Sequence, residues 1–123
     1  MAAVEVTPPG VGRRRVPRRL FEAPIGMLLH GTYSLQRTYQ VGEGGMMVSA
    51  PQDLVEGERM IISFYLPGVP LIIMRGIVRS VIPENGNNAE RYGVEFENLG
   101  FQHKREIRNF VAAATRDSSF AGF

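Results

Sequence analysis

Short apolar runs separated by turn-forming residues recur along most of the chain. Residues 23–41 contain two such runs around His30 and Gly31, and alternate apolar positions in the second run predict a β-hairpin. The glycine-rich stretch 42–45 predicts a turn that leads into a short strand over residues 46–49. The first half of the chain is therefore expected to be β-structure.

Two longer apolar runs follow in the middle of the chain. Residues 60–66 and 70–82 are rich in β-branched and aromatic side chains, which predicts two largely buried strands. Gly76 interrupts the second run, and we expect that strand to bend there. The composition of residues 84–90, with two asparagines flanking a glycine and a third following, predicts a turn.

The clearest alternation is in "RYGVEFENL", residues 91–99. Its even positions from 92 to 96 are apolar, whereas Glu95 and Glu97 occupy the other face, so we expect a strand with one buried and one acidic face. Five or six short strands separated by turns favour an antiparallel barrel or a sandwich.

Residues 101–117 depart from the β-pattern. Four apolar residues there have the i, i+3, i+4, i+7 spacing of an amphipathic helix: Ile107, Phe110, Val111 and Ala114. We expect this helix to pack its apolar stripe against one mouth or edge of the barrel.

The chain of 123 residues, 44% of them hydrophobic, fits one domain. Residues 1–19 combine prolines and glycines with arginines and predict a flexible arm, residues 20–116 the globular domain, and residues 117–123 a tail. No run approaches the roughly 18 apolar residues of a membrane-spanning helix, so we expect a cytoplasmic protein without membrane insertion.

Positive charge is concentrated in "RRRVPRR", residues 13–19, whereas the net charge of the chain is only +2. Lys104 is the single lysine among fourteen basic residues, and the planar arginine side chain suits bidentate contacts to phosphate or to a guanine edge. The run predicts a local anion site, although by itself it also fits a solvated arm or a nucleic-acid clamp.

Few residues could support catalysis. The chain has no cysteine, and His30 and His103 lack the spacing of a metal site. Glu95 and Glu97 fit a solvated strand face better than an acid–base pair. We therefore expect neither an enzyme nor a bound metal or cofactor.

"GEGG", residues 42–45, resembles a phosphate-binding loop in its glycines alone. It lacks the Lys-Ser/Thr that would follow, and a strand rather than a helix is predicted after it. A tight turn with glycines at positive φ is the favoured interpretation.

In order and spacing, these features resemble the PilZ domain family of bacterial receptors for cyclic di-GMP. The family signature is Arg-x-x-x-Arg before the first strand and (Asp/Asn)-x-Ser-x-x-Gly about twenty residues later. Arg14 and Arg18 match the first motif, and "QVGEGG", residues 40–45, stands at the second. The resemblance continues through "GIVRSV" and "YGVEFENL" into the helix, and so covers nearly the whole chain from Arg13.

This resemblance implies a six-stranded antiparallel barrel with a C-terminal helix. It also implies that cyclic di-GMP is held between the arginine segment and the glycine turn, with arginines on its phosphates and guanine edges and Arg79 placed to stack on a guanine. The implied ligand-binding residues are Arg14, Arg15, Arg18, Gln40, Gly42, Gly45 and Arg79.

Gln40 and Gly42 depart from the family pattern, where an acidic residue or Asn and a Ser are usual. The neutral amide of Gln40 is expected to weaken binding by about 1–3 kcal/mol. The leading hypothesis is a cyclic di-GMP receptor that signals to an unidentified effector protein by ordering its arginine arm. The alternatives are a nucleotide-independent adaptor in motility or pilus assembly and, disfavoured by the acidic strand face, a nucleic-acid-binding barrel.

Overall fold

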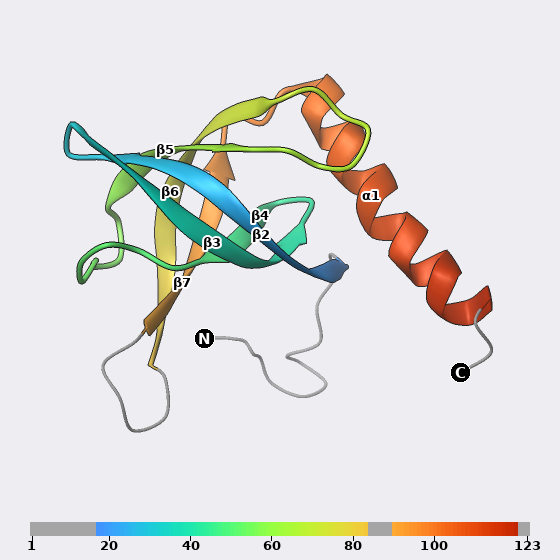
Figure 1. Cartoon of the computed structure of the whole chain (residues 1–123), viewed down its shortest axis with the longest axis horizontal. Helices are drawn as coiled ribbons and strands as arrows, with labels where there is room; N and C mark the ends of the chain where they lie inside the picture. The colour runs from blue at the N-terminus through green and yellow to red at the C-terminus, as the bar shows by residue number, and fades with distance from the viewer. Residues whose placement is uncertain (1–16, 84–89, 121–123) are drawn as a thin grey trace.

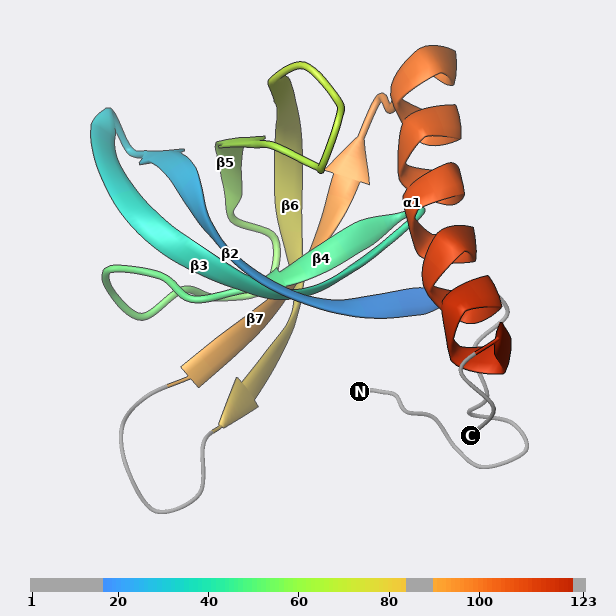
Figure 2. The same cartoon turned by 45° about the vertical axis from the view of Figure 1, so that its right-hand side comes forward.

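The structure, a computed structural model, describes residues 17–83 and 90–120. The described residues form six strands and one helix (Figure 1): β2 (Arg18–Leu29), β3 (Thr32–Gly42), β4 (Gly45–Val48), β5 (Arg59–Phe64), β6 (Ile72–Pro83), β7 (Glu90–Glu97) and α1 (Phe101–Phe120). The strands close into an antiparallel barrel in the order β2-β3-β4-β7-β6-β5 (Figure 2). The expected six-stranded barrel with a C-terminal helix is thereby confirmed.

The β2–β3 hairpin turns at His30 and Gly31, as expected. Both residues have positive φ, 51° and 81°, which is the conformation that a two-residue hairpin turn needs. β2 begins at Arg18, so the last two arginines of the "RRRVPRR" run belong to a strand and not to the expected arm. Residues 1–16 of that arm lie outside the described residues.

The barrel interior is filled by alternate residues of every strand, with Met27, Ile62, Phe64 and Val78 among the most buried. The expectation that residues 60–66 and 70–82 are largely buried is wrong for one face of β5 and β6. Ile73, for example, is 60% exposed. No described element covers the outer face of β5 and β6, and a continuous apolar run does not reveal that only one of its faces is covered.

Three strands have irregular registers. The shifts lie between Leu20 and Ala23 in β2, Thr38 and Gln40 in β3, and Val78 and Ser80 in β6. β6 is one strand as expected, but its irregularity lies beyond Gly76, where the ladder to both neighbours is regular. β-bulges of this kind bend strands and redirect side chains.

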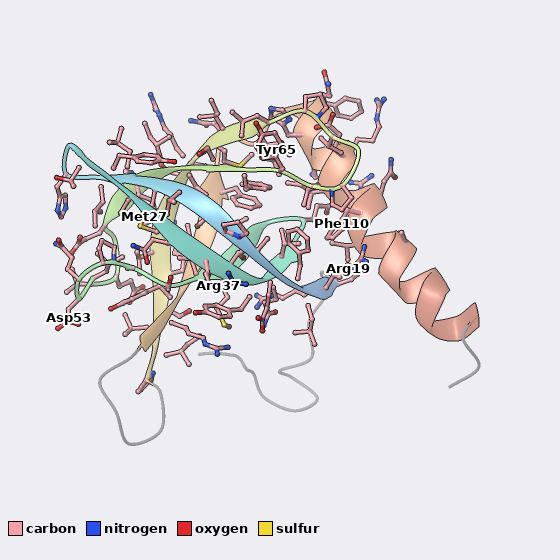
Figure 3. All side chains as sticks on the ribbon, in the orientation of Figure 1. Arg19, Met27, Arg37, Asp53, Tyr65 and Phe110 are labelled. Carbon is pink, nitrogen blue, oxygen red and sulfur yellow. The ribbon has the colours of Figure 1, made fainter. Side chains whose placement is uncertain are left out.

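α1 packs its apolar stripe against the barrel, where Ile107 and Val111 are buried in the core. Phe110 meets the ring of Phe21 edge to face at 4.9 Å. The guanidinium of Arg19 lies 3.9 Å above the Phe110 ring, and its Nη1 donates to the Phe110 carbonyl oxygen at 3.0 Å (Figure 3). The docked helix therefore holds the first residues of β2 in place.

The helix continues to Phe120, so residues 117–120 are helical and not part of the expected tail. Among the described residues, no helix combines the length and apolar character needed to cross a membrane.

Candidate functional site

A cleft of about 310 Å³ lies where the start of β2, the end of β3, β4, the second half of β6 and the middle of β7 meet. All three register shifts adjoin this end of the barrel. Five of the seven residues implied by the family resemblance line the cleft: Arg18, Gln40, Gly42, Gly45 and Arg79. The other two, Arg14 and Arg15, lie outside the described residues.

Strand pairing holds the two motifs side by side. Arg18 pairs with Gly42, and Leu20 pairs with Gln40, across the β2–β3 ladder. A Cβ atom on Gly42 would lie 3.0 Å from Cγ of Arg18 and 3.1 Å from the carbonyl oxygen of Pro17. The glycine therefore lets the stem of Arg18 pass close to the second motif.

Gly42 and Gly45 act through close approach, and no glycine of residues 42–45 has positive φ, which corrects the expectation for this turn. Positive φ among the described glycines is confined to Gly31, Gly57 and Gly68. A Cβ atom on Gly45 would overlap the carbonyl oxygen of Val94 on β7. The requirement for glycine here comes from a neighbouring strand that is distant in sequence.

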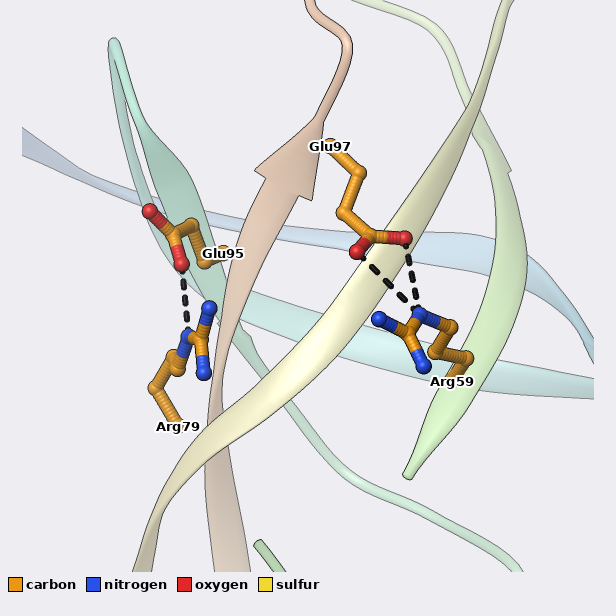
Figure 4. Close-up of polar contacts among 4 residues, drawn as sticks. All are labelled: Arg59, Arg79, Glu95 and Glu97. Carbon is orange, nitrogen blue, oxygen red and sulfur yellow. Dashed lines mark hydrogen bonds and ion pairs between the residues drawn. The ribbon is translucent and has the colours of Figure 1, made fainter. Parts of the chain in front are cut away.

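Arg79 occupies the bulge in β6 and reaches across to β7. Its Nε donates to Oε1 of Glu95 at 2.6 Å (Figure 4), and this hydrogen bond and charge raise the pKa of Arg79 above its ordinary value. Both side chains remain about half exposed, so the pair is solvated. Its position at the cleft distinguishes it from the other cross-strand pair in Figure 4, Arg59 with Glu97.

Glu95 is a member of the cleft that the sequence analysis missed. Its side chain does lie on the solvent face of β7, as expected, but pairing with Gly45 brings it to the wall of the cleft. The register between β4 and β7 is the only signal that connects Glu95 with the second motif, and a single sequence does not contain it. With Arg18 and Arg79, it gives the described cleft a formal charge of +1.

The loop of the second motif is also tied to the helix. Glu43 forms an ion pair with Arg108 of α1, and the carbonyl oxygen of Gly44 accepts a hydrogen bond from the backbone N–H of Phe96 at 2.8 Å. The Gly44 hydrogen bond joins the loop to β7, whereas the Glu43–Arg108 ion pair and the contacts of Arg19 connect both motifs to α1.

The two histidines lie away from the cleft, each beside a carboxylate. Nε2 of His30 is 3.4 Å from Oε1 of Glu58, and Nδ1 of His103 is 3.0 Å from Oε1 of Glu106, whose pKa this hydrogen bond lowers. Within residues 17–83 and 90–120, no group of three histidine or acidic side chains could hold a metal ion.

The geometry of the cleft suits an anion that carries a planar, hydrogen-bonding group. Guanidinium groups from β2 and β6 offer fixed donor pairs, which match phosphate oxygens or the O6 and N7 atoms of guanine. Gln40 and Glu95 add acceptors at the same place, and the glycines keep one wall open to the backbone.

Comparisons with solved structures identify similar folds. The inhibitor of motility MotI (DgrA) of Bacillus subtilis superposes with a TM-score of 0.76 at 13% identity, covering 87% of this chain and 53% of that one. The PilZ domain of Escherichia coli YcgR, solved with c-di-GMP, superposes with a TM-score of 0.67 at 19% identity. This match covers 86% of this chain and 94% of the YcgR domain. Klebsiella pneumoniae MrkH, solved as a c-di-GMP complex, superposes with a TM-score of 0.70 at 16% identity. This match covers 90% of this chain and 56% of MrkH.

This chain thus spans about half of MotI and of MrkH, and almost all of the isolated YcgR domain. At these identities the likeness concerns the fold. No curated protein matches the chain. The family model of the PilZ domain matches residues 12–113, which include both motifs, the barrel and most of the helix. The chain belongs to the PilZ domain family.

Proposed function

We propose that this PilZ domain binds cyclic di-GMP in the cleft between β2, β3, β6 and β7 and passes the signal to an effector protein. The observation that carries the proposal is the pairing of Arg18 directly with Gly42, beside Arg79. Two arginines from distant parts of the chain converge there on a surface where glycines keep the backbone accessible.

The size of the cleft supports a ligand that is only partly enclosed by the described residues. Its 310 Å³ is at the low end of the roughly 300–1,000 Å³ of small-molecule sites. A cyclic dinucleotide needs more enclosure than this, and the arginine arm that precedes Arg18 supplies it in our proposal. Arg14 and Arg15 would then contact phosphates from the open side, and ordering of the arm would create the signal.

Arg79 contributes its terminal nitrogens, since Glu95 accepts from Nε alone. Those nitrogens can donate to a phosphate or to guanine, and the flat guanidinium can stack on a base. Glu95 also opposes the ligand, because its negative charge offsets one of the two arginines. We therefore propose that Glu95 limits the affinity for an anionic ligand.

The helix is the route that we propose toward the effector. The ion pair of Glu43 with Arg108 and the contacts of Arg19 with Phe110 join both motifs to α1. A ligand that moves Arg18 or the 42–45 loop would change these contacts and hence the surface near the helix.

Isothermal titration calorimetry with cyclic di-GMP tests the binding step, using cyclic di-AMP as the control nucleotide. The wild type is expected to bind cyclic di-GMP, and Arg18→Ala to weaken binding at least tenfold, the size of a lost charge-assisted contact. Arg75→Ala removes an exposed arginine of β6 that lies outside the cleft and should bind normally. Equal affinities of the Arg18 and Arg75 variants would show that the ligand binds elsewhere.

A second function is favoured by one observation, the departure of Gln40 and Gly42 from the family motif. Without the usual acidic acceptor, the chain could act as a nucleotide-independent adaptor that works through protein contacts. Absence of heat with folded wild-type protein at high micromolar cyclic di-GMP would select this alternative over the receptor.

A further inference from the structure

Exposed apolar side chains are gathered on one side of the barrel, away from the cleft. Eleven large hydrophobic side chains remain exposed among the described residues, and seven of them lie on one outer face formed by β3, β2, β5, β6 and the residues next to β5 and β6. We call this the apolar face. Five belong to the paired strands: Leu28, Tyr33, Leu35, Ile61 and Ile73.

The strand register makes the apolar face continuous. One row crosses the four strands as Tyr33, Leu28, Ile61 and Arg75. The next row consists of Leu35, Gly26, Ser63 and Ile73. Tyr65 and Leu71, both exposed, continue the same alternation just beyond β5 and just before β6.

Gly26 keeps this surface flat. A Cβ atom at Gly26 would lie 2.5 Å from both Oγ of Ser63 and Oη of Tyr33. The tyrosine ring therefore lies across the sheet over the glycine and does not stand away from it. A flat, ordered apolar surface is suited to packing against another flat surface.

Charge is confined to the margin of the apolar face. Nε of Arg59 donates to Glu97 at 3.1 Å on one side, and Arg37 lies 3.8 Å from Glu22 on the other. Each of these pairs is neutral, and Arg75 at the end of one row is the cation without an ion pair to another described residue. An apolar centre with a mainly neutralised polar rim is typical of protein interfaces and unlike a nucleic-acid surface.

We propose that the apolar face is the interface of a homodimer, in which it packs against the same face of a second copy. Strand spacing makes the patch about 15 Å wide over four strands and about 13 Å long over three rows. That footprint of about 200 Å² is well below the roughly 800 Å² per partner of a standard interface, so we expect a weak dimer. The nearly neutral rim lets identical faces meet with little repulsion, which a two-fold dimer requires.

The face lies at the hairpin end of β2 and β3, whereas Arg18 and Gln40 of the cleft lie at the other end of the same strands. The dimer would therefore leave the cleft open, and the inference does not depend on which ligand, if any, the cleft binds.

Sedimentation equilibrium of the full chain tests this proposal. The wild type is expected to dimerise in the micromolar range, and the double variant Leu35→Lys with Ile73→Lys to be monomeric, because it buries charge in the interface. Val81→Lys is the matched control: Val81 is also exposed on β6 but lies eight residues from Ile73, about 26 Å along the strand.

Circular dichroism confirms that each variant is folded, since the substituted side chains are exposed. A monomeric wild type at hundreds of micromolar would overturn the proposal and leave the face to a different protein. A dimer that persists in the double variant would overturn it too, because the contact would then lie elsewhere.

Discussion

At the scale of single residues, Gln40 and Glu95 set the chemistry of the cleft. They line it together with Arg18 and Arg79. The charge of each side chain differs from the charge that would best suit a site for a guanine-containing anion. Gln40 is neutral where a carboxylate could accept from guanine N1–H and N2–H. Glu95 is acidic in a cleft where the proposed ligand would bring phosphates.

Gln40→Asp is expected to tighten cyclic di-GMP binding about ten- to a hundredfold, because a carboxylate accepts charge-assisted hydrogen bonds that an amide carbonyl does not. Calorimetric titration measures the change. Gln52→Asp places the same substitution in the exposed loop before β5 and should leave the affinity unaltered. Weaker binding by the Gln40 variant would mean that position 40 faces a phosphate and not a base.

Glu95→Gln is expected to raise the affinity severalfold, because Arg79 loses its anionic partner and the formal charge of the described cleft increases from +1 to +2. The gain should shrink as salt is added. Glu97→Gln on the same strand removes the partner of Arg59, outside the cleft, and serves as the control. A loss of affinity in the Glu95 variant would contradict its limiting role and indicate that it holds the ligand directly.

At the scale of elements, strand register explains why part of the site could be predicted from sequence and part could not. The alternation in residues 91–99 and the helical spacing of Ile107 and Val111 are local patterns, and the structure confirms both. The neighbourhood of Gly45, Arg79 and Glu95 depends on pairing between distant strands and on a bulge. Local periodicity contains neither, so it places Glu95 only on a solvated strand face.

The close packing of β4 on β7 gives a test at this scale. Gly45→Ala is expected to lower the free energy of unfolding by about 1–3 kcal/mol, because the added methyl group overlaps the backbone of Val94 and forces the strands apart. Gly44→Ala, where nothing lies within 4 Å of the added carbon, should have little effect. Urea denaturation measures both, and equal stabilities would contradict the described approach of the two strands.

At the scale of the whole molecule, β2 and β3 link three regions. Their hairpin end contributes to the apolar face, their other end forms the cleft, and the contacts of Arg19 and Phe21 with Phe110 join that second end to α1. A closed barrel has no free strand edge for partners. Interactions with other molecules must therefore use its faces, its helix or the segments outside the described residues.

Binding in the cleft is tested most directly by titrating ¹⁵N-labelled protein with cyclic di-GMP and following the glycine amide signals. The amides of glycines in the cleft should shift: Gly42, Gly44, Gly45 and Gly93. The amides of glycines in turns elsewhere should stay in place: Gly57 and Gly68. Unchanged spectra at saturating nucleotide, or shifts at Gly57 and Gly68 with none in the cleft, would contradict binding at this site.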